Sequence, residues 1–230
     1  MGFRLCHQKL DGYRTIGEHT ITSVHSARNI GAIIDSTLSL EKHVSSICRS
    51  AFYHLHNIGL VRKFLSNEAA KTAVQALVIS RLDSLNALLI GLPANLIAKL
   101  QRVQNCAARV ITGVGRFDHI TPVLNDLHWL RIKERVEFKI LLLVFKCLHN
   151  SGPEYLQSLL DFHRPGRQLR SANGLLLSRR RSRLVTFGDR AFSCVAPKLW
   201  NQLPSFIRES GSTPVFKKNL KTLLFGRYAQ

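Results

Sequence analysis

Arginine is the residue type in this sequence whose clustering could bind a ligand. The stretch HRPGRQLRSANGLLLSRRRSRLVTFGDR, residues 163–190, holds eight arginines and one acid. A guanidinium group presents a fixed fork of donors to a phosphate, and each contact with nucleic acid releases counterions. We therefore predict nucleic-acid contact at Arg164, Arg167, Arg170, Arg179, Arg180, Arg181 and Arg183. The alternatives are a solvated charge run or, in SRRRSR, a nuclear-import signal.

The charge of the whole chain favours the same kind of partner. The 230 residues carry a formal net charge of +19. Residues 161–230 hold 14 basic and 3 acidic side chains, against 19 and 11 in residues 1–160. Such an excess favours a polyanionic partner. A hydrophobic content of 45% excludes wholesale disorder, which requires low hydrophobicity.

Residues for catalysis or metal binding are dispersed. No two acidic residues are adjacent, and the five cysteines form no CxxC pair and no zinc spacing with histidine. We expect Cys48 and Cys106 to be reduced thiols on apolar helix faces. Asp83 is expected to form a local polar network with Arg81 and Asn86. The sequence therefore predicts no catalytic, metal or cofactor site in this chain.

Helical periodicity dominates after residue 38, where Ser39, Ser66 and Pro93 begin three amphipathic helices. Before it, HTITSVHS alternates and ARNIGAIID reads as one short strand ending at Asp35. Gly113 is expected to end the third helix. The apolar stripes of the three helices are Val44, Ile47, Cys48, Ala51, Leu55 and Ile58; then Val74, Leu77, Val78, Leu82, Leu85 and Leu89; then Leu96, Leu100, Val103, Ala107 and Ile111.

A further helix is expected over Lys133–Leu148, and residues 140–145 are apolar all round, which predicts a central, buried segment. Its apolar run is about half of the roughly 20 residues that a membrane span requires, so we expect no membrane association.

The C-terminal region is expected to hold short strands or loop near 175–177 and 184–186, a helix near Ala191–Trp200, and a last helix from Pro214. We expect that last helix to bury Phe216, Leu220, Leu223 and Leu224 and to expose Lys217, Lys218 and Lys221. Trp129 and Trp200 could stack on bases, but their leucine-rich surroundings favour the core.

Eight blocks of sequence, in order, resemble one protein family. They are NIGAIIDSTLSLEKHV (29–44), RSAFYHLHNI (49–58), SRLDSLNALLIGLP (80–93), LQRVQNCAARVITG (100–113), HITPVLNDLHWL (119–130), FKILLLVFK (138–146), GDRAFSCVAPKLWNQLP (188–204) and FKKNLKTLLF (216–225). The family is the reverse transcriptase of non-LTR (LINE-type, jockey-like) retrotransposons, and the resemblance is to the thumb and C-terminal region that follows the polymerase palm.

The resemblance implies a mainly α fold. We expect residues 1–38 to be a β hairpin at the palm–thumb junction, 39–160 a helical thumb-like bundle, and 161–230 a mixed, arginine-rich, basic C-terminal subdomain. The family's thumb would lay Arg102 and Arg109, seven residues apart on one helix side, along the primer–template duplex. The alternative interpretation, which we consider equally, is that these two residues lie on an ordinary solvent-exposed helix face.

The resemblance also implies a function. The parent enzyme is an RNA-directed DNA polymerase that needs Mg²⁺, held by paired aspartates in a Tyr-x-Asp-Asp hairpin. This chain has no such hairpin, so we expect a fragment that is catalytically inactive alone and contacts RNA or an RNA/DNA hybrid without sequence specificity. Its expected partners in a longer chain are the upstream palm and endonuclease regions, and its expected location is nuclear or cytoplasmic. The alternative is a helical protein-interaction module, or an inert transposon remnant without a selected partner.

Two positions depart from the family's pattern. Ser84-Leu85 stands where the family usually has Tyr-Cys, which we expect to be neutral for packing. Arg131 stands where the family usually has proline, which we expect to weaken the start of the following helix.

Overall fold

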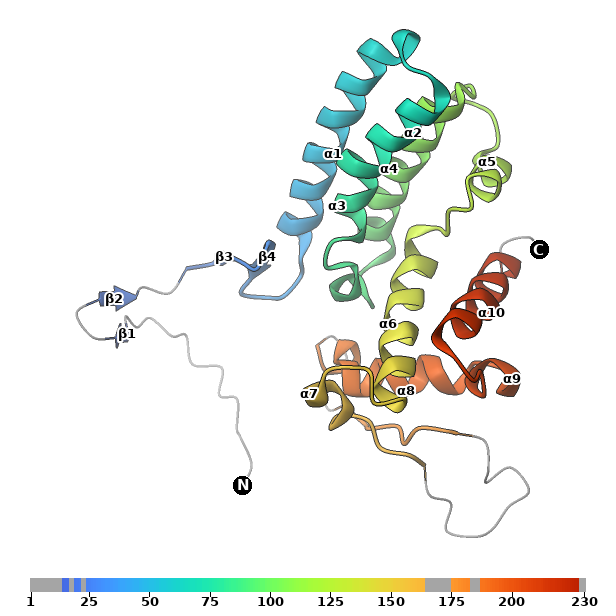
Figure 1. Ribbon diagram of the computed structural model, residues 1–230. Coiled ribbons are helices and arrows are strands. Elements are labelled where there is room, and N and C mark those ends of the chain that lie inside the picture. Colours follow the sequence, from blue (N-terminus) through green and yellow to red (C-terminus); the bar gives the residue numbers. More distant parts are fainter. Residues whose placement is uncertain (1–13, 17–18, 22–23, 164–174, 183–186, 228–230) are drawn as a thin grey trace. The chain divides into compact units, whose positions relative to one another are not determined.

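The fold is mainly helical, with small antiparallel hairpins at the N-terminal end (Figure 1). The computed structural model describes residues 14–16, 19–21, 24–163, 175–182 and 187–227. It divides into two compact units, residues 1–43 and 44–230. The mainly α fold with an N-terminal hairpin is the one predicted from the sequence.

The first unit contains two hairpins. Strand β1 (Arg14–Ile16) pairs with β2 (His19–Ile21), and β3 (Ser26–Asn29) pairs with β4 (Ala32–Asp35), both antiparallel. The single strand predicted over 27–35 is therefore wrong. The chain reverses at Ile30 and Gly31, whose φ angles are 47° and 86°. A two-residue hairpin turn needs positive φ at both positions, and isoleucine there gives no recognisable sequence signal.

Asp35 organises the chain between β4 and helix α1 (Glu41–Val61). Its carboxylate accepts the backbone N–H groups of Thr37, Ser39 and Leu40 at 2.8–3.1 Å, and the Thr37 hydroxyl at 2.7 Å. Ser39, the predicted N-cap, accepts the N–H of Glu41 at 3.3 Å. These hydrogen bonds hold the pKa of Asp35 far below its ordinary value, since the Thr37 hydroxyl and the backbone donors stabilise the charged carboxylate.

In the second unit, α1 lies beside α2 (Asn67–Val74), α3 (Ser80–Asp83) and α4 (Ala94–Thr112) (Figure 1). A 3₁₀ turn (Arg62–Phe64) follows α1, and Ser66 caps α2 as predicted, its hydroxyl accepting the Ala69 N–H at 3.1 Å. Gly113, at φ 74°, ends α4 as predicted. All five predicted apolar residues of α4 are buried.

The second predicted helix is interrupted, and this changes which residues it buries. A π-helical segment, η2 (Gln75–Ile79), joins α2 to α3, and a 3₁₀ turn, η3 (Asn86–Leu89), follows. Wider π turns rotate the face of the helix that follows. Leu77, within the π segment, and Leu85, which follows α3 at a φ of 54°, are exposed, against prediction, while Ile79 is buried.

Helix α6 (Ile132–Leu148) packs against α4, η3, α8 and α10, and follows the short α5 (Ile120–Asp126). The predicted all-round burial of 140–145 is only partly right. Ile140, Leu141, Val144 and Phe145 are buried, but Leu142 and Leu143 are half-buried. Neighbours therefore cover most of this helix but leave one side of it partly open.

The C-terminal helices close this core. They are the short α7 (Glu154–Gln157), the 3₁₀ turn η4 (Gly188–Arg190), α8 (Phe192–Asn201), α9 (Ser205–Arg208) and α10 (Thr213–Gly226). Phe216 of α10 stacks on Phe145 of α6, with ring centroids 4.2 Å apart, and beside Trp200 of α8. Trp129 and Trp200 are buried, as their leucine-rich surroundings predicted. The predicted domain boundary at residue 160 stays a prediction.

Two further properties bear on function. Among the described residues, no helix is both long and apolar enough to span a bilayer. Cys48, Cys106, Cys147 and Cys194 are free thiols, and Cys48 and Cys106 are partly rather than fully buried.

Candidate nucleic-acid interface

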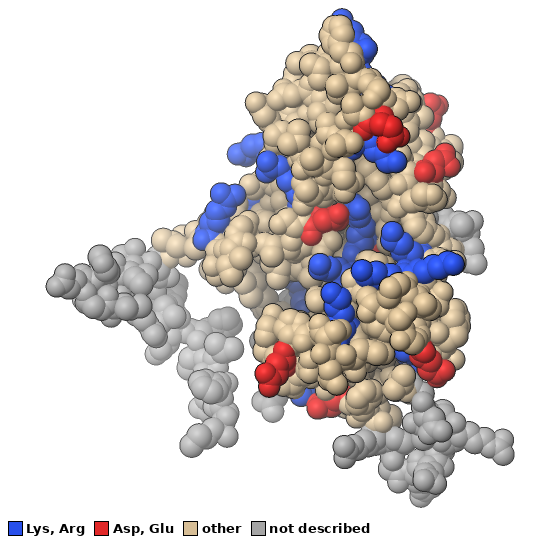
Figure 2. All heavy atoms as spheres, in the orientation of Figure 1, with Lys and Arg blue, Asp and Glu red and all other residues tan. Residues whose placement is uncertain are grey.

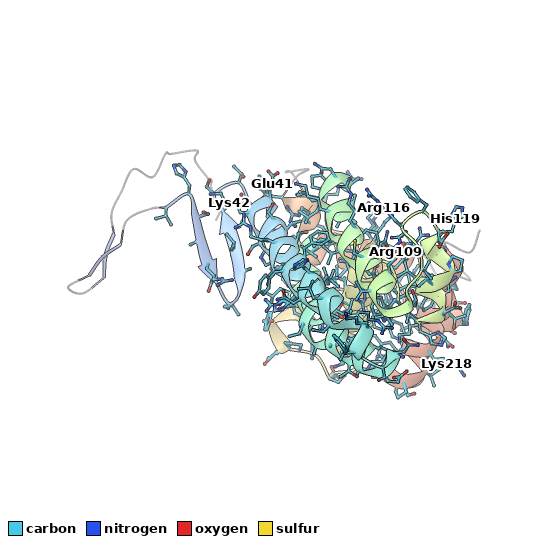
Figure 3. All side chains as sticks on the ribbon, turned by 90° about the horizontal axis from the view of Figure 1, so that it is seen from above. Glu41, Lys42, Arg109, Arg116, His119 and Lys218 are labelled. Atoms are coloured by element: carbon cyan, nitrogen blue, oxygen red, sulfur yellow. The ribbon has the colours of Figure 1, made fainter. Side chains whose placement is uncertain are left out.

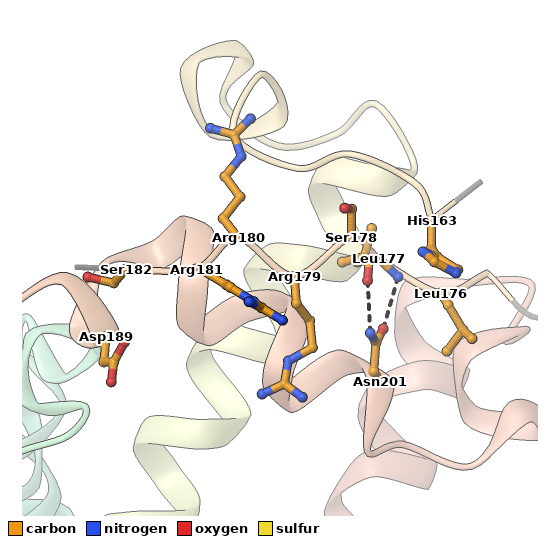
Figure 4. A pocket seen from close by; sticks show the side chains of 10 residues that line it. All are labelled: His163, Leu176, Leu177, Ser178, Arg179, Arg180, Arg181, Ser182, Asp189 and Asn201. Atoms are coloured by element: carbon orange, nitrogen blue, oxygen red, sulfur yellow. Dashed lines mark hydrogen bonds between the residues drawn. The ribbon is translucent and has the colours of Figure 1, made fainter. Parts of the chain in front are cut away.

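The segment that carries Arg179, Arg180 and Arg181 is fixed by the residue just before it. Leu177 is buried, and the side-chain amide of Asn201 in α8 clamps it, accepting its N–H at 2.9 Å and donating to its carbonyl at 2.8 Å (Figure 4). The Ser178 N–H donates to the Asp161 carbonyl at 2.7 Å, and Phe162 forms a β-bridge with Leu177. Local strand-like pairing was expected at 175–177, and this bridge is its observed form.

The three arginines project alternately from this extended segment. Figure 4 shows Arg179 and Arg181 on one side of the backbone and Arg180 on the other, as extended backbone requires. They line an open hollow of about 810 Å³ together with His163 and Asp189. All three side chains are exposed. Three guanidinium groups on consecutive residues can therefore meet phosphates on more than one side.

Arg180 differs from its neighbours because it has an acidic partner. Its Nη2 lies 2.8 Å from Asp161 Oδ2, and both side chains are about half exposed. Arg179 and Arg181 have no hydrogen bond or ion pair within the described part of the chain. The predicted residues Arg164, Arg167, Arg170 and Arg183 lie outside the described residues.

The two predicted residues of α4 are used differently. Arg102 is exposed. Arg109 is partly buried and donates from Nε to the Gly115 carbonyl and from Nη2 to the Asp118 carbonyl, each at 3.1 Å. In Figure 3, Arg109 of α4 lies near Arg116 and His119, two residues of the segment that follows α4. Arg109 therefore fixes the loop between α4 and α5, and Arg102 is the side chain of the two that faces solvent.

Two other arginines serve the fold. Arg62 donates to the carbonyls of Val110 and Ile111 at 2.8 Å, and so satisfies the C-terminal end of α4. Arg190 donates to the carbonyls of Ile90 and Leu88 at 3.1 and 3.3 Å and packs on Gly91. Sequence gave no signal for either role, because the carbonyl acceptors are 48 to 102 residues away.

Basic side chains also gather on a second face, where the exposed lysines predicted on the last helix lie near basic residues of α6. Figure 2 shows Lys and Arg spread across the middle of one face, over α6 and α10. Lys139 of α6 and Lys217, Lys218 and Lys221 of α10 are exposed. The spacing of Arg135 and Lys139 indicates part of this basic face in the sequence, because residues four apart lie on the same side of a helix.

The polar network predicted at Asp83 forms with a different arginine. Asp83 pairs with Arg135, Nη2 to Oδ2 at 3.4 Å, and the Asn86 side chain acts to lower the pKa of its carboxyl. The predicted partner Arg81 instead donates to the Leu77 carbonyl and contacts His54. Asp83 and Arg81 are neighbours in the sequence, but α6 brings the guanidinium of Arg135, 52 residues further along the chain, within ion-pair distance of Asp83.

The arrangement is suited to binding polyanions by charge. Within the described ranges, no three His, Cys, Asp or Glu side chains converge as a metal site would require. Comparison of the chain with protein-family models, curated proteins and solved structures found no match.

Proposed function

We propose that this chain binds the phosphate backbone of RNA or an RNA/DNA hybrid without reading base sequence. The observation that carries the proposal is the row of exposed guanidinium groups at 179–181, held by the Asn201 clamp on Leu177. Three adjacent cations with one acidic partner, in a chain of +19 net charge, favour a partner with many phosphates. Clamping reduces the entropy that the arginines would lose on binding.

We also propose that the chain is the thumb and C-terminal portion of a retrotransposon-type RNA-directed DNA polymerase. Support comes from the eight ordered sequence blocks and from a helical bundle compatible with a thumb. In that setting the chain would hold RNA and nascent DNA, while a palm outside this sequence would supply the Mg²⁺ site. The palm and endonuclease regions would be its covalent partners.

The salt dependence of RNA binding tests the backbone proposal. Replacing Arg179, Arg180 and Arg181 by Gln removes up to three phosphate contacts. The slope of log affinity against log salt should then flatten by about 2–3 units on duplex, at roughly 0.9 per phosphate. The measurement is fluorescence anisotropy with labelled RNA and RNA/DNA hybrids of two unrelated sequences, between low and physiological salt.

A matched variant separates this site from general charge. Lys63→Gln, Lys71→Gln and Lys133→Gln remove the same charge from exposed positions away from the tract. This control should change the slope by less than about one unit, because diffuse charge contributes fewer direct contacts. Equal slopes for both triple variants, with circular dichroism showing both folded, would refute the tract as the contact surface.

A second candidate function rests on apolar exposure. Phe52, Tyr53 and Leu60 of α1, and Phe64 just after it, are 42–77% exposed. Such a group is typical of a protein contact and favours the protein-interaction alternative. If the wild-type chain binds neither RNA nor hybrid at low salt, this alternative or an inert remnant replaces the backbone proposal.

A further inference from the structure

A second basic site lies in a hollow of about 330 Å³ between η3, α6 and α10. The Asp83–Arg135 ion pair lines it from the end of α3 and from α6, and the Asn86 amide lines it from η3. Lys139, Lys221 and His128 line it with exposed side chains. The apolar part of the lining is Leu130, Phe138 and Leu142. Two helices far apart in sequence, α6 and α10, thus bring Arg135, Lys139 and Lys221 to one concave place.

The hollow is electropositive despite its acid. Arg135, Lys139 and Lys221 bring three positive charges against the single carboxylate of Asp83. Burial raises the pKa of Asp83, and the nearby Arg135 and Lys139 oppose this rise. Burial lowers the pKa of Arg135, and Asp83 opposes that change. The ion pair therefore lies in a partly desolvated place, where an added anion interacts more strongly than at an open surface.

Hydrogen-bonding capacity in the hollow is left unused. The Nη2 atom of Arg135 forms the ion pair with Asp83. Its Nη1, a buried atom, has no hydrogen-bond partner among the described residues. The buried Oδ1 of Asn86 likewise lacks a donor in the described part of the chain. Buried polar atoms are nearly always satisfied in folded proteins, so an unmet donor and an unmet acceptor on two residues that line the same hollow indicate a ligand with both functions.

We propose that this hollow binds a phosphate group carried on a nucleotide, either free or within a strand. Phosphate oxygens would accept from the Arg135 guanidinium and from the ammonium groups of Lys139 and Lys221, as charge-assisted hydrogen bonds. A ribose hydroxyl would donate to Asn86 Oδ1. The Phe138 and Leu130 side chains supply the apolar wall that a sugar or base requires. This site is separate from the arginine tract and does not depend on its function.

The test compares two double variants that each lose two positive charges, one set from the hollow and one set from outside it. Lys139→Gln with Lys221→Gln removes two cations from the hollow, and Lys217→Gln with Lys218→Gln removes two exposed cations of α10 that do not line it. Binding is measured by calorimetry with inorganic phosphate, pyrophosphate and a mononucleotide. Fluorescence anisotropy with a short oligonucleotide covers the strand-borne case. Chloride at matched ionic strength is the reference.

The hollow variant should weaken binding by about tenfold, since two charge-assisted hydrogen bonds are lost, and the α10 control by less than about threefold. Loss with phosphate, pyrophosphate or nucleotide assigns the site to a free ligand. Loss with the oligonucleotide only assigns it to a strand phosphate. Equal effects of the two double variants, or no binding of any probe by the wild-type chain, overturn the proposal. Loss of oligonucleotide binding in the arginine-tract variant, with phosphate binding kept, would separate the two sites.

Discussion

Asp35 is the clearest case of one side chain fixing local structure. Its carboxylate gathers three backbone N–H groups in the five residues between β4 and the start of α1. These donors would otherwise lack partners at the entry to a helix. A single acid therefore fixes the backbone between β4 and the first residue of α1, and its charge state should affect the local stability of residues 36–40.

Replacing Asp35 by Ala should destabilise this junction by about 1 kcal/mol, as losing an N-cap side chain does. Hydrogen exchange of the Ser39 and Leu40 amides should accelerate about fivefold at neutral pH. Because the folded pKa of Asp35 lies below its ordinary value of 3.8, the stabilisation is fully present above about pH 4. It is lost as pH falls through the lower, folded value. The difference between wild type and variant should therefore shrink below pH 4, and a constant difference would contradict this role.

Asp83 and Arg135 should show unequal single-variant effects. The Arg135 side chain is 17% exposed and that of Asp83 is 39% exposed, so the guanidinium is the more costly charge to leave alone. Asp83→Asn should reduce the free energy of unfolding by about 1–3 kcal/mol, after allowance for solvent screening. Arg135→Gln should cost less. In urea denaturation, the double variant should be more stable than the sum of the two losses predicts. Simple additivity would show that the pair is not coupled.

At the scale of elements, α6 shows how a uniformly apolar stretch acquires a buried and an open side. Leu141 and Phe145 face the core, and Phe145 stacks on Phe216 and also on His149. Leu142 lies on the wall of the hollow instead. Hydrophobicity alone could not distinguish these adjacent leucines, because neighbouring helices decide which side they cover.

Adjacent leucines of α6 therefore make a matched pair. Leu141→Ala should cost about 2–5 kcal/mol of unfolding free energy, the range of fully buried leucine. Leu142→Ala should cost about 1 kcal/mol, because the side chain is already partly in contact with water. Thermal or urea unfolding of the two variants measures both. If Leu142→Ala costs as much as Leu141→Ala, the hollow is closed in solution and the phosphate site loses its entrance.

For the whole molecule, we expect this chain to bind nucleic acid without catalysing phosphoryl transfer. Two-metal phosphoryl transfer needs carboxylates that converge on two ions about 3.5–4 Å apart. The acids of this sequence are dispersed, with no adjacent pair. Polyanion binding needs only cations on a stable frame, which the helical unit supplies at the tract and on the α6–α10 face.

The purified chain should therefore not extend a primer on an RNA template with magnesium or manganese. The measurement is template-dependent nucleotide incorporation, with heat-inactivated protein as the background. An active reverse transcriptase assayed in parallel verifies the reagents. Incorporation above background that requires the template would mean that the dispersed acids converge, and the proposed division between this chain and a palm would be wrong.

Helix periodicity, caps and charge distribution were determined by the sequence itself. Leu96, Leu100 and Val103 repeat at helical spacing because one side of a helix must leave water, and Ser66 and Gly113 act on backbone groups within a few residues. Local physics suffices for these features.

Tertiary structure decided the features that depend on distant backbone. Leu77 in the π segment is exposed, Asp83 pairs with Arg135 rather than Arg81, and Arg62 donates to carbonyls at the end of α4. The exposed tract and the hollow between η3, α6 and α10 likewise form where separate segments meet, at Asn201 with Leu177 and at Lys139 with Lys221. Charge and burial at such places depend on packing between elements, and a linear pattern encodes the period of each helix but not the partner that covers it.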